Sequence, residues 1–144
     1  MGYPLQGIKV LDLSRVLAGP FAGRMLSDMG ADVVKLEPPE GDVTRLWGRK
    51  IGGVAGYYHQ QNAGKRNISI DLRKEEGVSI AKALASQADV LIENFRPDVM
   101  RRLGLSYETL SALNPRLIML SISCLLYTSP SPRDQRGSRM PSSA

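Results

Sequence analysis

Arginine and lysine side chains stand beside several apolar runs that have the length of β-strands. They occur at Arg15, at Lys65-Arg66, at Arg73 and at Arg96. An arginine can hold a phosphate through two hydrogen bonds and a lysine supplies a point charge, while the ring of Phe95 offers a face to an adenine or a pantetheine chain. These residue types favour a site for a phosphate-rich ligand, and the alternative that they leave open is a solvated basic rim.

Two familiar phosphate-binding patterns fail at the residues that their chemistry needs. Gly64-Lys65 would close a Walker loop, but His59 stands where its first glycine is required, and Arg66 stands where a Ser or Thr would bind magnesium. No G-x-G-x-x-G follows the first apolar run, so the dinucleotide-binding pattern is absent as well. The sequence therefore disfavours nucleoside triphosphatases and NAD enzymes.

Other residue types with possible chemistry have weaker patterns around them. His59 is the single histidine and has no visible partner, so we predict a structural role for it. Asp12 and Glu37 each end an apolar run, where a carboxylate can cap, pair or catalyse. Trp47 and the pair Tyr57-Tyr58 can form a lid or pack against the protein, and we predict packing.

These residues must be positioned by strands and helices that alternate along the chain. We expect strands at 8–13, 31–36, 67–72, 89–93 and 117–122, and helices from Gly19-Pro20 to Gly30 and at 74–86, 97–103 and 106–113. Residues 41–65 show no clean period and are predicted to be a long loop or an irregular excursion. The alternation predicts an open, mostly parallel α/β sheet, whose ligands bind beyond the carboxyl ends of the strands.

Length and composition indicate one globular domain or part of one, since the 144 residues are 42% hydrophobic. We expect a cytoplasmic protein with no membrane contact, because no apolar run approaches the length of a membrane helix and the start resembles no signal peptide. The formal net charge is +5, to which Arg133, Arg136 and Arg139 contribute. This mild positive balance suits anionic ligands but does not indicate nucleic acid as a partner.

The composition changes abruptly near the end of the chain, where Ser, Pro and Arg dominate from Tyr127 onward. Residues 124–129 can be encoded by TGTCTCTTATACACATCT, which resembles the transposon end of a sequencing-library adapter. We therefore predict that residues 124–144 are a disordered, artefactual tail, the alternative being a natural flexible one. The single cysteine, Cys124, lies in this segment, so residues 1–123 contain none for a disulfide or a metal site.

Six blocks of sequence occur in an order and spacing that point to one family. They are Pro4-Leu5-Gln6-Gly7-Ile8-Lys9-Val10-Leu11-Asp12, Leu17-Ala18-Gly19-Pro20, Gly30-Ala31-Asp32-Val33-Val34-Lys35-Leu36-Glu37-Pro38-Pro39, Gly64-Lys65-Arg66-Asn67, Asp89-Val90-Leu91-Ile92-Glu93-Asn94-Phe95-Arg96-Pro97 and Asn114-Pro115-Arg116-Leu117-Ile118. Together they resemble the family III CoA transferases, the group of formyl-CoA and carnitine CoA transferases. The resemblance covers about Pro4 to Ser123.

The resemblance implies that residues 1–123 are the amino-terminal part of a Rossmann-like large domain in an interlocked homodimer. It also implies a site for coenzyme A and no metal. The residues carried over to that site are Leu17, Ala18, Ile70, Asp71, Leu72, Arg73, Asn94, Phe95, Arg96 and Arg102. Relatives can carry a basic residue just after the glutamate that ends the second strand, where this chain has Pro38. That difference puts a phosphate contact at Pro38 in doubt.

The chemistry that the resemblance implies is transfer of CoA between an acyl-CoA and a small carboxylic acid. In this family an aspartate attacks the thioester and passes through anhydride and aspartyl-CoA thioester intermediates. That aspartate is expected downstream of the point that matches Ser123, so no residue here is assigned a catalytic role. We therefore expect the 144-residue chain itself to be inactive.

Two alternatives to a transferase remain open from the sequence. An α-methylacyl-CoA racemase would bind the same cofactor and abstract a proton beside the thioester carbonyl, and a non-catalytic module would bind acyl-CoA alone. The insertion at 52–63 and the asparagine Asn94 favour the transferase. Racemases resemble one another in lacking this insertion, and they differ from this chain at the position of Asn94.

Overall fold

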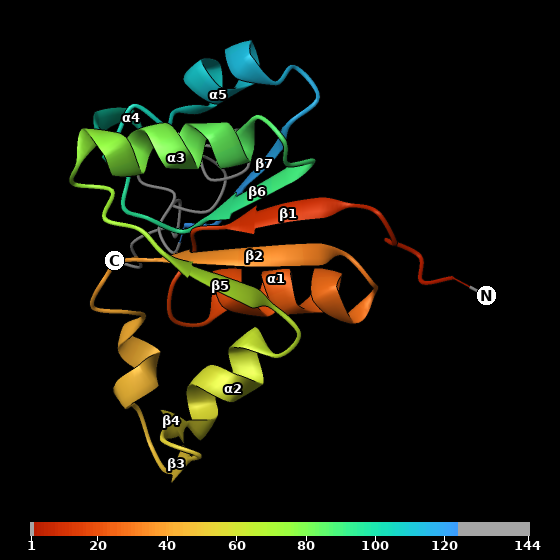
Figure 1. The fold of residues 1–144 in the computed structure, drawn as a ribbon, viewed down its shortest axis with the longest axis vertical. Coiled ribbons are helices and arrows are strands. Elements are labelled where there is room, and N and C mark those ends of the chain that lie inside the picture. Colours follow the sequence, from red (N-terminus) through yellow and green to blue (C-terminus); the bar gives the residue numbers. More distant parts are fainter. Residues whose placement is uncertain (1, 124–144) are drawn as a thin grey trace, which may run out of the picture.

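A five-stranded sheet forms the centre of the computed structural model, which describes residues 2–123 (Figure 1). Its strands are β1 (Lys9–Asp12), β2 (Asp32–Glu37), β5 (Arg66–Ser69), β6 (Val90–Glu93) and β7 (Ile118–Ser121). They lie in the order β5-β2-β1-β6-β7, and every neighbouring pair is parallel. This confirms the predicted open, parallel α/β sheet. The strand order reverses direction between β1 and β6, which is where ligands of such sheets bind.

Helices cover both faces of the sheet. They are α1 (Ala18–Asp28), α2 (Gly56–Asn62), α3 (Glu75–Ala85), α4 (Val99–Arg102) and α5 (Tyr107–Leu113). Helices α3, α4 and α5 lie on one face and α1 on the other, with α2 beside α1 (Figure 1). None of the helices within residues 2–123 combines the length and the apolar character that crossing a bilayer requires.

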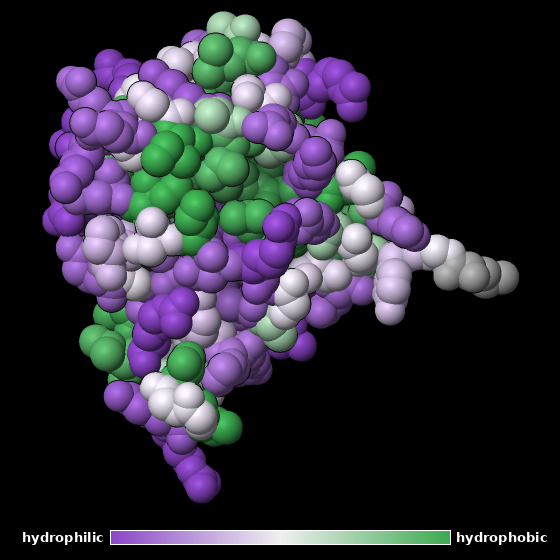
Figure 2. All heavy atoms as spheres, viewed as in Figure 1, coloured by the Kyte–Doolittle hydropathy of each residue, from purple (hydrophilic) through white to green (hydrophobic). Residues whose placement is uncertain are grey.

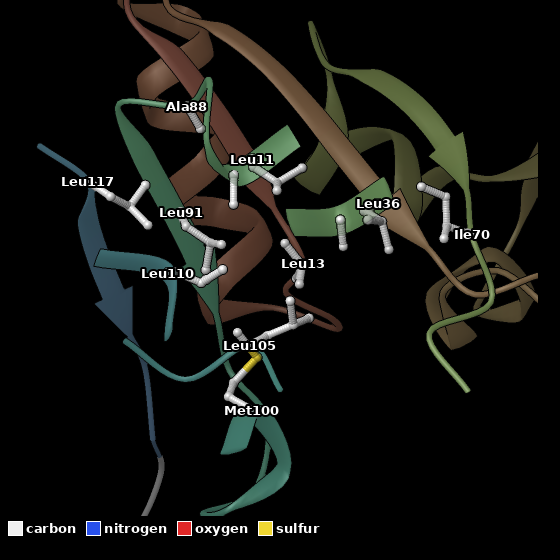
Figure 3. Close-up of a cluster of buried hydrophobic side chains, with 12 residues drawn as sticks. Leu11, Leu13, Leu36, Ile70, Ala88, Leu91, Met100, Leu105, Leu110 and Leu117 are labelled. Carbon is white, nitrogen blue, oxygen red and sulfur yellow. The ribbon is translucent and has the colours of Figure 1, made fainter. Parts of the chain in front are cut away.

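Alternation along the strands divides the core into two layers. Leu11 and Leu91 point toward α3 and α5, where they join Leu110 and the other side chains of Figure 3. Their neighbours Val10 and Ile92 point to the opposite face, toward α1. Because successive strand residues face opposite sides, each strand contributes to both layers. Burial of each large aliphatic side chain stabilises the fold by about 1.5–3 kcal/mol.

The ends of α1 and α5 follow their local sequence signals, with a shift at the start of α1. Gly30 has φ +97° immediately after the last turn of α1, as a left-handed helix end requires. Ser106 caps the start of α5, where its side chain accepts a hydrogen bond from the backbone N–H of Thr109. Helix α1 begins at Ala18 and not at Gly19-Pro20, so the proline occupies the first turn but not its first position. Any position in the first turn suits proline, because N–H groups there have no helical partner.

The prediction of a long loop at residues 41–65 is wrong. The segment forms the short 3₁₀ helix η1 (Val43–Leu46), the hairpin strands β3 (Lys50–Ile51) and β4 (Val54–Ala55), and α2. The hairpin turns at Gly52-Gly53, where both residues have positive φ, so its signal was available in the sequence. Helix α2 was not predicted because its buried face includes the polar residues Gln61 and Asn62, so the segment lacks a helical hydrophobic period. The prediction for residues 124–144 lies outside the described residues.

Candidate functional site at the carboxyl edge of the sheet

An open cleft of about 530 Å³ lies beyond the carboxyl ends of β1, β2, β5 and β6. Its apolar floor includes Leu13, Leu36 and Ile70, which end or follow three of these strands. Figure 2 shows apolar side chains gathered on the molecule between α3 and the strands, with polar side chains around them. Parallel strands end at one edge, so the chain segments that follow them meet there although they are far apart in sequence.

Six of the ten residues predicted to bind a cofactor line this cleft. They are Ile70, Asp71, Leu72, Arg73, Phe95 and Arg96. Arg102 lines a neighbouring hollow, which shares Leu72 and Arg73 with the cleft. Leu17 precedes α1 and Ala18 begins it, and neither lines the cleft. The structure therefore brings the segments around residues 70–73 and 95–96 together on one cleft, whose lining does not include Leu17 or Ala18.

A third wall of the cleft was not predicted as part of the site. Pro38, Glu40 and Gly41 follow β2 and line the cleft opposite residues of the 95–96 segment. They could have been found from the sheet alone, because β2 ends at the same edge as β1 and β6. The predicted phosphate site was based on charged residues, and Pro38 was not included because it carries no charge.

Arg73 is the most strongly paired cation of the cleft. Its Nε donates to Asp71 Oδ1 at 2.8 Å, and its Nη2 donates to Glu40 Oε1 at 3.0 Å. Hydrogen bonds from Arg73 hold the pKa of the Asp71 carboxyl below its usual value. A hydrogen bond to its own backbone, followed by the bond from Arg73, does the same for the pKa of Glu40. A phosphate that binds Arg73 must therefore compete with two ionised carboxylates.

Arg15 extends over the opposite side of the cleft. Its guanidinium carbon lies 5.3 Å from the centre of the Phe95 ring, within the range of a cation–π contact. Both side chains line the cleft. A guanidinium stacked in this way keeps the outward-facing N–H groups available to an anion.

Glu37 is the last residue of β2, and its carboxylate accepts hydrogen bonds from several residues. Its partners are Arg45 Nε at 2.6 Å and Nη2 at 3.0 Å, the hydroxyl of Tyr58, Asn67 Nδ2 at 2.6 Å and the backbone N–H of Asp42 at 3.0 Å. Burial raises the pKa of Glu37, but the bonds from Arg45 and Tyr58 outweigh it and the net shift is downward. Of the roles left open for Glu37, the structure therefore shows pairing.

Asp12 belongs to a second buried polar cluster, between β1 and α1. Its Oδ2 accepts from Lys65 Nζ at 2.8 Å, and its Oδ1 accepts from the backbone N–H of Ser14 at 2.9 Å. Lys65 Nζ also donates to the carbonyl of Pro20 at 2.7 Å and to Asn62 Oδ1 at 2.9 Å. The side chains of Lys65 and Asp12 are 1% and 0% exposed, so the ion pair is shielded from water. Asp12 is thus a pairing residue too.

The remaining aromatic residues and the histidine lie away from the cleft. Trp47 packs on Tyr57 with ring centres 5.6 Å apart, and Tyr58 is buried under the guanidinium of Arg45. The predicted packing role is therefore confirmed for Trp47 and the tyrosine pair. His59 is exposed, and its Nε2 lies 3.4 Å from the carbonyl oxygen of Ile51. Within residues 2–123 no three His, Cys, Asp or Glu side chains gather as metal ligands would.

Comparison with known proteins identifies a consistent set of relatives. The model of CoA-transferase family III matches residues 5–138. A succinate–glutarate CoA-transferase of Agrobacterium fabrum is 51% identical over 135 residues, covering 88% of this chain and 34% of the relative. The human succinyl-CoA:glutarate CoA-transferase is 43% identical over 129 residues, which cover 88% of this chain and 30% of the human protein. The chain thus spans about a third of the length of these curated relatives.

A solved structure agrees with the sequence relatives. A CAIB/BAIF family protein from Brucella suis superimposes with a TM-score of 0.80 at 48% identity, covering 84% of this chain and 33% of that protein. The sheet and helices described above are therefore the architecture of the corresponding third of that structure.

Proposed function

Because the chain belongs to CoA-transferase family III, we propose that its cleft binds the CoA part of an acyl-CoA, within an enzyme that moves CoA to a carboxylic acid. The observation that carries this proposal is the combination of three guanidinium groups with an apolar floor. Arg15, Arg73 and Arg96 line one cleft together with Leu36 and Ile70. CoA requires both features, since its phosphates are anionic and its pantetheine arm is largely apolar.

The proposed reaction uses a carboxylate nucleophile that residues 2–123 do not supply. An aspartate attacks the thioester carbonyl carbon and CoA leaves as a thiolate, giving a mixed anhydride. The thiolate then attacks the aspartyl carbonyl of the anhydride, releases the first acid and forms the aspartyl-CoA thioester. The acceptor acid takes CoA by the reverse sequence. We place this aspartate in the two thirds of the relatives' length that the chain does not span, and we expect the chain alone to be inactive.

Transfer between acids is favoured over racemisation by the relatives, whose names describe CoA-transferases. An assay that supplies an acyl-CoA with and without an acceptor acid separates the two, because a racemase needs no acceptor. The interlocked homodimer, the cytoplasmic location and the absence of a metal stay predictions.

Calorimetry with CoA tests the binding proposal on the 144-residue chain. We expect saturable binding, weakened about tenfold by Arg73→Ala and by Arg96→Ala, since each removes charge-assisted hydrogen bonds to phosphate. Arg66→Ala is the matched control, because Arg66 pairs with Asp32 on the surface outside the cleft. A folded chain that takes up no CoA, or one in which all three replacements act alike, contradicts the proposal.

Removing a carboxylate that competes for Arg73 is expected to strengthen CoA binding. Glu40→Gln withdraws one of the two carboxylates paired with Arg73 and lowers the negative charge of the cleft. We expect CoA to bind about threefold more tightly, because an exposed ion pair of this kind contributes little more than that. The comparison is with Glu108→Gln on α5, whose carboxylate does not line the cleft. Equal or weaker binding by Glu40→Gln would show that Arg73 is not the phosphate ligand.

A further inference from the structure

The side chain of Asn94 is paired with the backbone of Arg15. Its Oδ1 accepts a hydrogen bond from the Arg15 N–H at 2.7 Å, and its Nδ2 donates one to the Arg15 carbonyl at 2.7 Å. The Asn94 amide and the Arg15 backbone thus form a ring closed by two hydrogen bonds, similar to the paired bonds between neighbouring strands. Asn94 was predicted to contact CoA, yet it does not line the cleft.

The loop that Asn94 grips is held in a conformation that it would not adopt by itself. Val16 has φ 71°, in the left-handed region that β-branched residues avoid. Side chains from β2 and the segment after it also hold this loop. Asp42 Oδ2 accepts from the Val16 N–H at 3.2 Å, and Lys35 Nζ donates to the Ser14 carbonyl at 2.6 Å. Four hydrogen bonds from outside the loop therefore fix three consecutive residues.

The direction of the Arg15 side chain follows from this grip. With its N–H and its carbonyl both held, the Arg15 backbone aims the guanidinium at the Phe95 ring, 5.3 Å away at the wall of the cleft. Asn94 and Phe95 are adjacent, so one turn of chain after β6 supplies both the backbone clamp and the stacking surface. A positioned guanidinium loses less conformational freedom when a phosphate binds.

From this geometry we propose that Asn94 is a positioning residue, which strengthens CoA binding through Arg15 and does not touch CoA itself. The inference rests on the proposed function, because CoA is the ligand that the cleft is proposed to hold. It predicts that the contribution of Asn94 to affinity disappears once the Arg15 guanidinium has been removed.

A double-mutant cycle measured by calorimetry with CoA tests this dependence. Asn94→Ala and Arg15→Ala are each expected to weaken binding about tenfold, and the double variant no more than Arg15→Ala alone. The control cycle combines Asn94→Ala with Arg73→Ala, whose effects should multiply because Arg73 belongs to a different wall. A loss of overall stability would weaken both cycles equally, so it cannot imitate this result.

Hydrogen exchange at the Arg15 amide tests the clamp without any ligand. We expect protection in the wild-type chain and exchange at least about tenfold faster in Asn94→Ala, which removes the acceptor. Asn94→Asp takes its place if Asn94→Ala does not fold, because it keeps an acceptor for the N–H but turns an oxygen toward the Arg15 carbonyl. It should preserve protection of the Arg15 amide but lose the bond to the Arg15 carbonyl, so that CoA binding weakens only when the Arg15 guanidinium is present.

The outcomes separate this inference from the function on which it rests. A folded wild-type chain that binds no CoA defeats the proposed function. A chain that binds CoA but shows multiplying effects of Asn94→Ala and Arg15→Ala defeats the inference alone, since Asn94 would then contact the ligand directly. Equal exchange of the Arg15 amide in wild type and Asn94→Ala also overturns it.

Discussion

Replacing Asp12 with alanine is expected to lower the free energy of unfolding by about 3–5 kcal/mol, the cost of leaving a buried charge without its partner. Lys65 is 1% exposed and cannot reach water from its position between β1 and α1. Burial already lowers the pKa of Lys65, and the attraction of Asp12 opposes that shift. Without the carboxylate the buried amine must either stay charged with only the neutral acceptors of Pro20 and Asn62, or lose its proton, and both weaken the fold. Urea unfolding followed by circular dichroism measures the change.

Two further variants make that expectation specific to the buried pair. Asp32→Ala removes the carboxylate of the surface pair with Arg66, whose side chains are 50% and 69% exposed, and should cost at most about 1 kcal/mol. Asp12→Leu combined with Lys65→Met removes both charges at once and should recover part of the lost stability, because apolar residues can replace a buried ion pair. A drop for Asp12→Ala no larger than that for Asp32→Ala would show that Lys65 is not confined as the structure has it.

The sheet could be predicted from the sequence because its strands carry their own signal. Leu91-Ile92 is apolar on both faces of β6 and both side chains are buried in the two core layers, as in a strand between two layers of helices. Val33-Val34 carries the same signal in β2, with Val33 buried and Val34 half-buried. The roles of Asp12 and Glu37 could not be predicted in the same way. Lys65 lies 53 residues after Asp12, and no local pattern indicates which distant side chain a buried carboxylate will meet.

The cleft was predictable to the extent that its residues follow strand ends or belong to a recognised block. The segment at 95–96 meets both conditions and the segment at 70–73 meets the first, and the structure places them on one cleft. The role of Asn94 required coordinates, because its neighbours Glu93 and Phe95 indicate nothing about an amide that turns toward Arg15. Sequence resemblance can assign a block to a ligand, but it cannot tell a residue that touches the ligand from one that supports it.

Glu37→Gln is the second change with a large expected effect, and its signature is the pH dependence of stability. The folded protein holds the pKa of Glu37 below its usual value of 4.5. An ionised group with a lowered pKa contributes stability that is complete above the unfolded value and is lost as pH falls through the folded one. The wild-type chain should therefore lose stability progressively below about pH 4.5, where unfolded glutamates begin to take up protons.

Glutamine keeps the shape of Glu37 but neither its charge nor its titration. At pH 7 we expect Glu37→Gln to lose about 2–3 kcal/mol, because hydrogen bonds from Arg45 and Tyr58 to a charged acceptor become bonds to a neutral one. As pH falls through the lowered pKa of Glu37 the variant and the wild type should converge, so the acid limb of the variant is shallower. It is not flat, because Asp42 also has a lowered pKa: burial raises it, but hydrogen bonds from Thr44 outweigh the burial.

Thermal unfolding between pH 3 and pH 7 measures both limbs, with Glu76→Gln on the exposed face of α3 as the control. The control should follow the wild type within about 0.5 kcal/mol at every pH, because an exposed carboxylate of this kind interacts little with the fold. Parallel curves for Glu37→Gln and wild type would mean that folding does not lower the pKa of Glu37. Arg45, Tyr58 and Asn67 would then stabilise the carboxylate no more than water does, which contradicts the hydrogen bonds that the structure assigns to Glu37.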